Sequence, residues 1–480
     1  MKKMTSTLTK RMVLAGMSIV VLAFACKSRE DAIEPRTSQH NATEATLRLS
    51  IGRPNEVVLR GEGQAKKDPL TMIKRLRFVF YRQGGKGYQV AVIKEQNIEE
   101  DSQLENLKLV LPQDDYKLVV VANPSARLIE LTAPDMPLDS VVQARPMKSS
   151  QFRVARDVYE GVSMLNEQGA LSIPSGAFSE GHLPTRVTLE ASLARVLVYG
   201  NPQLNGGRKG NAPARYVVSN LLNEVAPLRP LGKLLSGQDE LVGDQSLKSN
   251  RYAASSVWAQ WQESKPQNTR GVGHFTPELY AMDELWTSVA MTPEAYKSRL
   301  GEGNLYVKES VIPPTAYLRG TVPCVVLAYP YIPRGVTLTD GEGWVAFRGV
   351  YYSEKSFKSF ITSQQYPTDA LKEAVNKASI GLDAFNQSFD KEGIRFYHQG
   401  ISYYTIYIKH FGHSESPKAH GLYGVVRGNE YRVKLVSISE PGLPVPPVFT
   451  DNLDEISESS FTGISTGTTA VVERDQSAQL

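Results

Sequence analysis

The stretch Ala45-Thr46-Leu47-Arg48-Leu49-Ser50-Ile51 alternates strictly between apolar and polar residues. Successive side chains of a β-strand point to opposite faces, so Leu47, Leu49 and Ile51 share one face and the polar residues share the other. The pattern predicts a half-buried strand. Short apolar runs of similar length recur along the rest of the chain, and this favours a mainly β fold.

Two predicted hairpins follow this strand. In each, two apolar runs flank a turn rich in glycine, proline or aspartate, which is the pattern of antiparallel neighbours. The runs are Arg75–Tyr81 with Tyr88–Ile93, and Leu107–Leu111 with Tyr116–Ala122.

The second half of the chain also consists mainly of predicted strands. Val187–Tyr199 has the pattern of one long strand that opens a second β module, and Trp344–Tyr352 that of another single strand. Pro367–Ala378 predicts a short helix that begins after Thr368, a residue suited to cap its first turn.

The N-terminus has the pattern of an export signal. Four basic residues precede the apolar run Met12–Phe24, which is too short to span a bilayer as a stable helix. Ala25 and then Cys26 follow, as in a bacterial lipoprotein, whose first mature residue is an acylated cysteine. The alternative is ordinary signal cleavage beside an incidental cysteine.

Composition excludes several classes of protein. Of the 480 residues, 54 are Lys or Arg and 50 are Asp or Glu. Residues 1–60 hold ten of the former and five of the latter, so the remainder carries 44 against 45 and is close to neutral. A near-neutral body gives no electrostatic footprint for nucleic acid. Cys324 is the only cysteine besides Cys26, and we expect it to be a small buried apolar residue.

Two motifs could indicate chemistry. Gly463-Ile464-Ser465-Thr466-Gly467 matches the nucleophile elbow of hydrolases, but no histidine follows it. His410, His413 and His420 are close enough in sequence to ligate a metal, although loop histidines are more often solvated. We therefore expect no metal, no cofactor and no enzymatic activity.

Three stretches resemble the fimbrillin family of Bacteroidales, the subunits of donor-strand fimbriae. They are Leu111–Asn123, Phe396–His410 and Tyr423–Val433 with the Gly442-Leu443-Pro444 that follows. The third is the most specific, although Gly428 stands where the family usually has asparagine. The resemblance covers about residues 45–447 and implies two tandem β-sandwich domains of transthyretin-like type with short helical insertions.

The resemblance also implies a maturation pathway. Family members are exported as lipoproteins and cut after an arginine, which discards the first strand and leaves a groove for a strand of another subunit. Arg60, before Gly61, is the predicted site, because Pro54 follows Arg53 and Arg48 lies inside the strand. Burial of the three apolar side chains of the first strand is worth about 5–9 kcal/mol.

These expectations define five segments: a signal peptide (1–25), a lipidated propeptide (26–60), an N-terminal domain (61–185), a C-terminal domain (186–447) and a tail (448–480). The best donor segment in the tail is Ala470-Val471-Val472, which is a poor one. A weak donor favours an accessory or tip subunit. The expected partners are other subunits, an arginine-specific protease, the outer membrane and host proteins or glycans. The alternative is a surface lipoprotein that keeps its N-terminus and binds glycan or protein.

Overall fold

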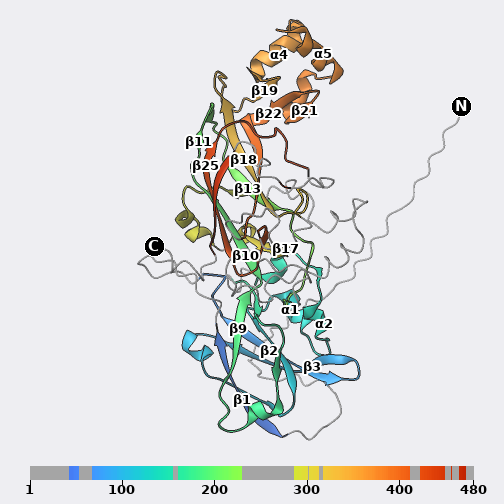
Figure 1. Cartoon of the computed structure of the whole chain (residues 1–480), viewed down its shortest axis with the longest axis vertical. Helices are drawn as coiled ribbons and strands as arrows, with labels where there is room; N and C mark the ends of the chain where they lie inside the picture. Colours follow the sequence, from blue (N-terminus) through green and yellow to red (C-terminus); the bar gives the residue numbers. More distant parts are fainter. Residues whose placement is uncertain are drawn as a thin grey trace, which may run out of the picture. The chain divides into compact units, whose positions relative to one another are not determined.

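The structure is a computed structural model, and it describes residues 43–52, 68–154, 161–229, 286–300, 302–312, 317–410, 422–448, 456 and 464–471. Within these residues the fold is mainly β with a few short helices (Figure 1), as the sequence predicts. No described helix has the length and apolar character needed to cross a membrane.

The first sheet gathers strands from the N-terminal part of the chain in the order β3-β2-β5-β7-β9-β1-β4, with β8 beside β5. The strands are β1 (Glu44–Gly52), β2 (Arg75–Gly84), β3 (Gly87–Asn97), β4 (Leu107–Pro112), β5 (Tyr116–Ala122), β7 (Met164–Asn166), β8 (Leu171–Ile173) and β9 (Thr185–Ala191). The predicted β2–β3 hairpin is present, with residues 75–84 paired antiparallel to residues 87–97.

The second predicted hairpin is wrong. β4 pairs with β1, whereas β5 pairs with β2, β7 and β8. The two runs do form strands, but they lie in different parts of the sheet. Alternation and turn residues identify a strand without identifying its neighbour, which tertiary packing decides.

The strand β2 is buried on both faces, from Leu76 through Tyr81. Its second face is covered near α1 (Ala126–Leu131), because the Arg77 guanidinium donates to both the hydroxyl and the carbonyl of Thr132, each at 3.0 Å. The helix α2 (Asp139–Val142) follows in the chain. The alternation in Arg75–Tyr81 indicates a single buried face, because the charged Arg77 suggests that the opposite face is exposed to solvent.

The predicted long strand Val187–Tyr199 is divided between two sheets. β9 ends at Ala191 in the first sheet, and β10 (Leu193–Tyr199) begins a second, so the chain changes sheets at Ser192. This lies just beyond the predicted domain boundary at 185/186, which itself stays a prediction.

The second module is a sandwich of two five-stranded sheets. Buried residues of both sheets belong to one apolar core, and the Tyr216 hydroxyl of one donates to the Val196 carbonyl of the other at 2.8 Å. One sheet holds β10, β11 (Gln203–Leu204), β16 (Tyr306–Lys308), β25 (Glu430–Ile438) and β26 (Ile464–Val471). The other holds β12 (Gly207–Lys209), β13 (Arg215–Ser219), β15 (Thr287–Ser288), β18 (Cys324–Pro333) and β23 (Ile401–Tyr407).

A small module is inserted between β18 and β23, which pair with each other from Cys324↔Tyr407 to Pro330↔Ile401. It has its own aromatic and aliphatic core. Its elements, in orange in Figure 1, are β19 (Trp344–Phe347), β20 (Val350–Ser353), α4 (Glu354–Ser363), α5 (Asp369–Lys377), β21 (Phe389–Lys391) and β22 (Ile394–Tyr397).

The local structure of this insertion was predicted in part. The Thr368 hydroxyl accepts from the Leu371 amide at 3.2 Å and caps α5, as expected. The single strand predicted for Trp344–Tyr352 is instead a hairpin. Arg348 (φ 47°) and Gly349 (φ 79°) both adopt the left-handed backbone that a tight two-residue turn requires.

Cys324 is fully buried with a free thiol, as predicted.

Short elements complete the described part of the fold. The remaining strands are β6 (Arg145–Pro146), β14 (Glu224–Val225), β17 (Ser310–Val311) and β24 (Gly424–Val425), and the 3₁₀ turns are Asp101–Leu104, Ser149–Phe152, Ser175–Phe178, Pro293–Arg299, Gly303–Leu305, Leu382–Asn386 and His398–Gly400.

Candidate functional site

The first strand lies within the first sheet rather than at its edge. β1 pairs antiparallel with β4 over residues 44–49 and parallel with β9 over residues 49–52. Leu49 is the one position in these two ladders with a partner on each side, Leu107 and Thr185. Removing β1 would therefore leave two strands without the neighbour that they share.

The apolar face of β1 fills the core. Leu47 and Leu49 are fully buried and Ile51 is nearly so, while Ala45 packs against the same cluster. Arg48 is exposed between them. Each buried aliphatic side chain is worth roughly 1.5–3 kcal/mol, so this strand makes a large contribution to the stability of the first sheet.

The residues predicted to direct export and cutting, Cys26, Arg60 and Gly61, lie outside the described residues. The chain is described again from Asp68, so the predicted cleavage site falls in the segment that joins β1 to Asp68.

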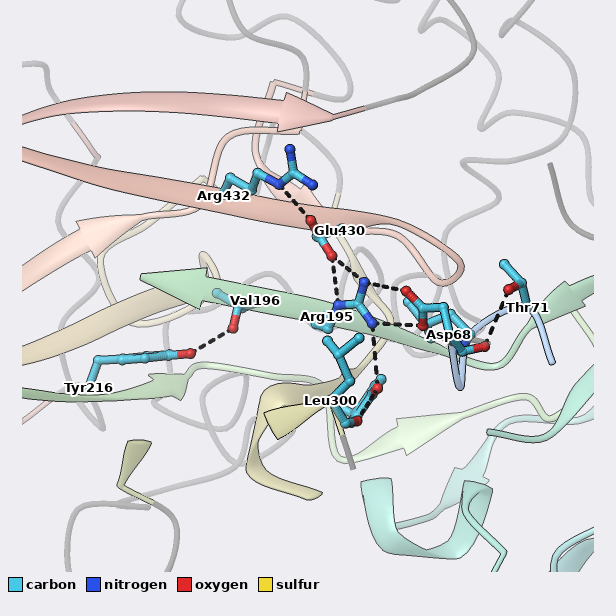
Figure 2. Close-up of polar contacts among 10 residues, drawn as sticks. Asp68, Thr71, Arg195, Val196, Tyr216, Leu300, Glu430 and Arg432 are labelled. Atoms are coloured by element: carbon cyan, nitrogen blue, oxygen red, sulfur yellow. Dashed lines mark hydrogen bonds and ion pairs between the residues drawn. The ribbon is translucent and has the colours of Figure 1, made fainter. Parts of the chain in front are cut away.

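Asp68 is held by a buried arginine (Figure 2). Arg195, on β10, donates to both Asp68 carboxylate oxygens, at 2.8 and 2.7 Å, and its Nε donates to Glu430 on β25 at 2.7 Å. The Arg195 side chain is 1% exposed. Arg432 donates to the second oxygen of Glu430 at 2.6 Å. This Asp68–Arg195–Glu430–Arg432 chain, hereafter the Arg195 cluster, joins the segment after β1 to the second module.

The charges in the Arg195 cluster support one another. Burial alone would lower the pKa of Arg195, but its hydrogen bond to Asp68 and the charges of Glu430 and Asp68 raise it above its ordinary value. Sequence reasoning missed this residue. Its signal was a lone arginine inside the apolar run Leu193–Val198, where a charge must find buried partners.

A second buried cluster lies where β9 meets the second module. Arg229 forms ion pairs with Glu190 of β9 at 3.0 Å and with Glu309 at 3.3 Å. Arg427 donates to Glu309 at 3.0 Å and to the Pro227 carbonyl at 2.7 Å. Burial raises the pKa of Glu190 to about 7 against the opposing effect of the two arginines. Burial acts the same way on Glu309, but Arg427 and Arg229 lower its pKa.

The C-terminal tail contributes an edge strand. Residues 464–471 form β26 and pair antiparallel with β25, with Ala470 opposite Tyr431 and Val471 opposite Glu430. Val472, the third residue of the predicted donor segment, lies outside the described residues. The same pairing places Ser465 of the predicted nucleophile motif in a strand, opposite Ser437, and not at a strand-to-helix turn.

The histidine hypothesis can be examined at one position. His410 is buried, its Nδ1 lies 2.7 Å from the Tyr431 hydroxyl, and burial together with the Arg229 charge lowers its pKa to about 3. His413 and His420 lie outside the described residues. No group of three potential metal ligands occurs among the residues that the structure describes.

Comparison with known proteins gives one family match. Residues 395–468 match the family described as major fimbrial subunit protein type IV, fimbrillin, C-terminal. The matched stretch runs from β22 into β26 and contains two of the three stretches on which the resemblance rests. A search of curated proteins found no match.

Several solved structures are similar at low sequence identity. A fimbrilin (fimA) from Porphyromonas gingivalis is 14% identical with a TM-score of 0.41, covering 89% of this chain and 97% of that chain. A protein described as a cell adhesion protein from Parabacteroides distasonis is 12% identical with a TM-score of 0.42, covering 89% and 98%. The tip fimbrial protein Mfa3 from P. gingivalis, with a C-terminal truncation, is 11% identical with a TM-score of 0.35, covering 89% and 100%.

The class of protein follows from the family match. The match to a fimbrial subunit family indicates a structural, non-enzymatic protein. Over residues 395–468 the resemblance to the fimbrillin family is confirmed, because this part of the chain matches the model of the fimbrillin C-terminal region. The narrower resemblance to an accessory or tip subunit stays a prediction.

Proposed function

We propose that this protein is a subunit of a cell-surface fimbria and that it accepts a strand from another subunit in place of β1. The position of β1 carries this proposal. It lies between β9 and β4 and inserts Leu47, Leu49 and Ile51 into the core. Loss of such a strand exposes two sheet edges and an apolar slot, and strand addition supplies both main-chain hydrogen bonds and side chains for the pockets.

Maturation would open this site. In the proposal the chain is exported as a lipoprotein acylated at Cys26, is held at the outer membrane, and is cut after Arg60 by an arginine-specific protease. The Arg195 cluster supports the last step, because it anchors Asp68 on the far side of the predicted cut. The chain from Asp68 onward would then stay anchored to the second module while β1 departs.

The test is the N-terminal residue of the protein in outer-membrane and fimbrial fractions. We expect acylated Cys26 in the former and Gly61 in the latter. An Arg60→Ala variant should keep its propeptide and be absent from fimbriae, and Arg53→Ala serves as a control that is still cut. Acylated Cys26 in every fraction would refute the proposal.

Within the fibre, an accessory or tip position fits the tail best. The core-facing residues of β1 are three large aliphatic side chains two residues apart, whereas Ile464–Val471 offers mainly serine, threonine and glycine. A tail of this composition would fill the slot of another subunit poorly. A peptide of residues 448–480 should therefore fail to bind a processed bulk subunit, and tight binding would argue for a position inside the shaft.

A second candidate is a surface lipoprotein that keeps its N-terminus and binds a glycan or a host protein. The observation that favours it is the completeness of the uncut first sheet, in which β1 is paired on both sides. The same N-terminal measurement separates the two functions.

A further inference from the structure

The two strands that flank β1 differ in what else supports them. Within the described residues, every strand pairing of β4 is to β1, from Leu107↔Leu49 to Pro112↔Glu44. The next amide, that of Gln113, also donates to this segment, at the Thr43 carbonyl, at 3.0 Å. The backbone partners that the structure gives β4 therefore all belong to the part of the chain that the proposed cut removes.

β9 has a second support. Its C-terminal half pairs with β7, from Asn166↔Leu189 to Met164↔Ala191, and Glu167 donates to the Thr188 carbonyl at 2.9 Å. The strand β9 also continues through Ser192 into β10, where Arg195 lies. The half of β9 that follows Thr188 thus stays in place without β1.

The buried side chains of β4 also pack beside β1. Leu107, Leu109 and Leu111 face the core beside the aliphatic side chains of β1, and Val110 on the opposite face is 49% exposed. At the C-terminal end of β4 the ties to the rest of the chain are side-chain hydrogen bonds: the Tyr116 hydroxyl donates to the Pro112 carbonyl at 2.9 Å, and the side-chain amide of Gln113 donates to the Ser175 carbonyl at 3.0 Å. A six-residue strand with no paired neighbour does not hold its conformation in water.

We propose that the acceptor site is completed by its partner: β4 leaves the sheet when β1 is removed and folds back onto it together with the incoming strand. This inference rests on the proposed function. The partner is a strand of another subunit that runs antiparallel to β4 and parallel to β9. It carries large aliphatic residues at three alternate positions that match Leu47, Leu49 and Ile51. Binding begins at Thr185–Thr188 of β9, next to the half that β7 supports, and is then extended by β4.

Hydrogen exchange tests the folding step. The full chain would be compared with the chain cut at residue 60, or at a protease site engineered into residues 61–64, each with and without a peptide of residues 43–52. We expect amides 107–111 to lose protection after the cut, amides 118–122 of β5 to keep it, and the peptide to restore the former. Amides 107–111 that stay protected in the cut chain without peptide would overturn the inference.

A matched pair of variants tests it independently. Val110→Gly lowers the strand preference of an exposed β4 position, and Val350→Gly makes the same change at a valine that is 50% exposed on β20. If β4 folds on binding, Val110→Gly weakens the binding of the peptide about fivefold and leaves the stability of the cut chain unchanged. If β4 is already in place, the cut chain loses stability and the peptide affinity stays the same, which contradicts the inference.

The two proposals fail differently. A cut chain in which amides 107–111 lose protection but the peptide does not bind supports the dependence of β4 on β1 and refutes strand acceptance. A cut chain that binds the peptide with amides 107–111 protected throughout does the reverse.

Discussion

Replacing Arg195 with methionine should destabilise the junction between the first sheet and the second module. Methionine keeps an unbranched chain of similar length but removes the guanidinium, so Asp68 and Glu430 lose their shared counter-charge. The Glu430 side chain is 4% exposed and that of Asp68 is 12% exposed. Breaking a buried ion pair by removing one partner costs about 3–5 kcal/mol, and we expect about 3 because Arg432 still contacts Glu430.

The same carboxylate provides the control. Arg432→Met removes the other arginine from Glu430, but the Arg432 side chain is 22% exposed, so the expected loss is about 1 kcal/mol or less. Urea unfolding of the intact chain, with hydrogen exchange at amides 193–199 and 70–72, would measure both. Arg195→Met should also release amides 70–72, because the Leu70 amide donates to the Asp68 carboxylate at 2.9 Å. Equal losses from the two variants would refute this account of the cluster.

Three further outcomes are expected. Leu49→Ala, at a fully buried position, should lower the free energy of unfolding of the uncut chain by about 2–5 kcal/mol, measured with denaturant. Thr46→Ala, at an exposed position of the same strand, should lower it by less than about 0.5 kcal/mol. Similar losses from the two variants would contradict the apolar slot that Leu49 fills. Folding raises the pKa of Glu190 from 4.5 to about 7, so its contribution to stability is full below pH 4.5 and is lost as pH rises through 7. Glu190→Gln should remove that share of the pH dependence of the free energy of unfolding. The same pH dependence in the variant and the natural chain would contradict this role of Glu190. Thr368→Ala, which removes the cap of α5, should lower the stability of the inserted module by about 1 kcal/mol, measured by exchange at amides 371–377.

Sequence patterns predicted the strands better than their partners. The alternation that marks β1 and the turn that joins β2 to β3 are local signals, and both were sufficient. The pairing of β4 with β1 joins residues about sixty apart in the chain, and no local pattern encodes it. The break at Ser192 was hidden because apolar residues continue on both sides, so one run served two sheets.

The candidate site was predicted in the same uneven way. The core-facing residues of β1 followed from period-two alternation alone. The Arg195 cluster did not, because its members come from three distant parts of the chain. An arginine inside an apolar run indicates that it has buried partners, but not which residues they are. The family resemblance supplied the idea that β1 is removed, which no physical feature of the sequence dictates.

The insertion between β18 and β23 has a consequence for how this protein can vary. Its chain leaves the sandwich at the end of β18, after Pro333, and re-enters it at Ile401, which lies opposite Pro330. The insertion encloses its own core, and the stacked rings of Trp344 and Tyr397 lie at its base. A short turn could close the same two strands. Evolution, or a protein engineer, can therefore exchange this piece for another while the surfaces that pair strands elsewhere keep their shape.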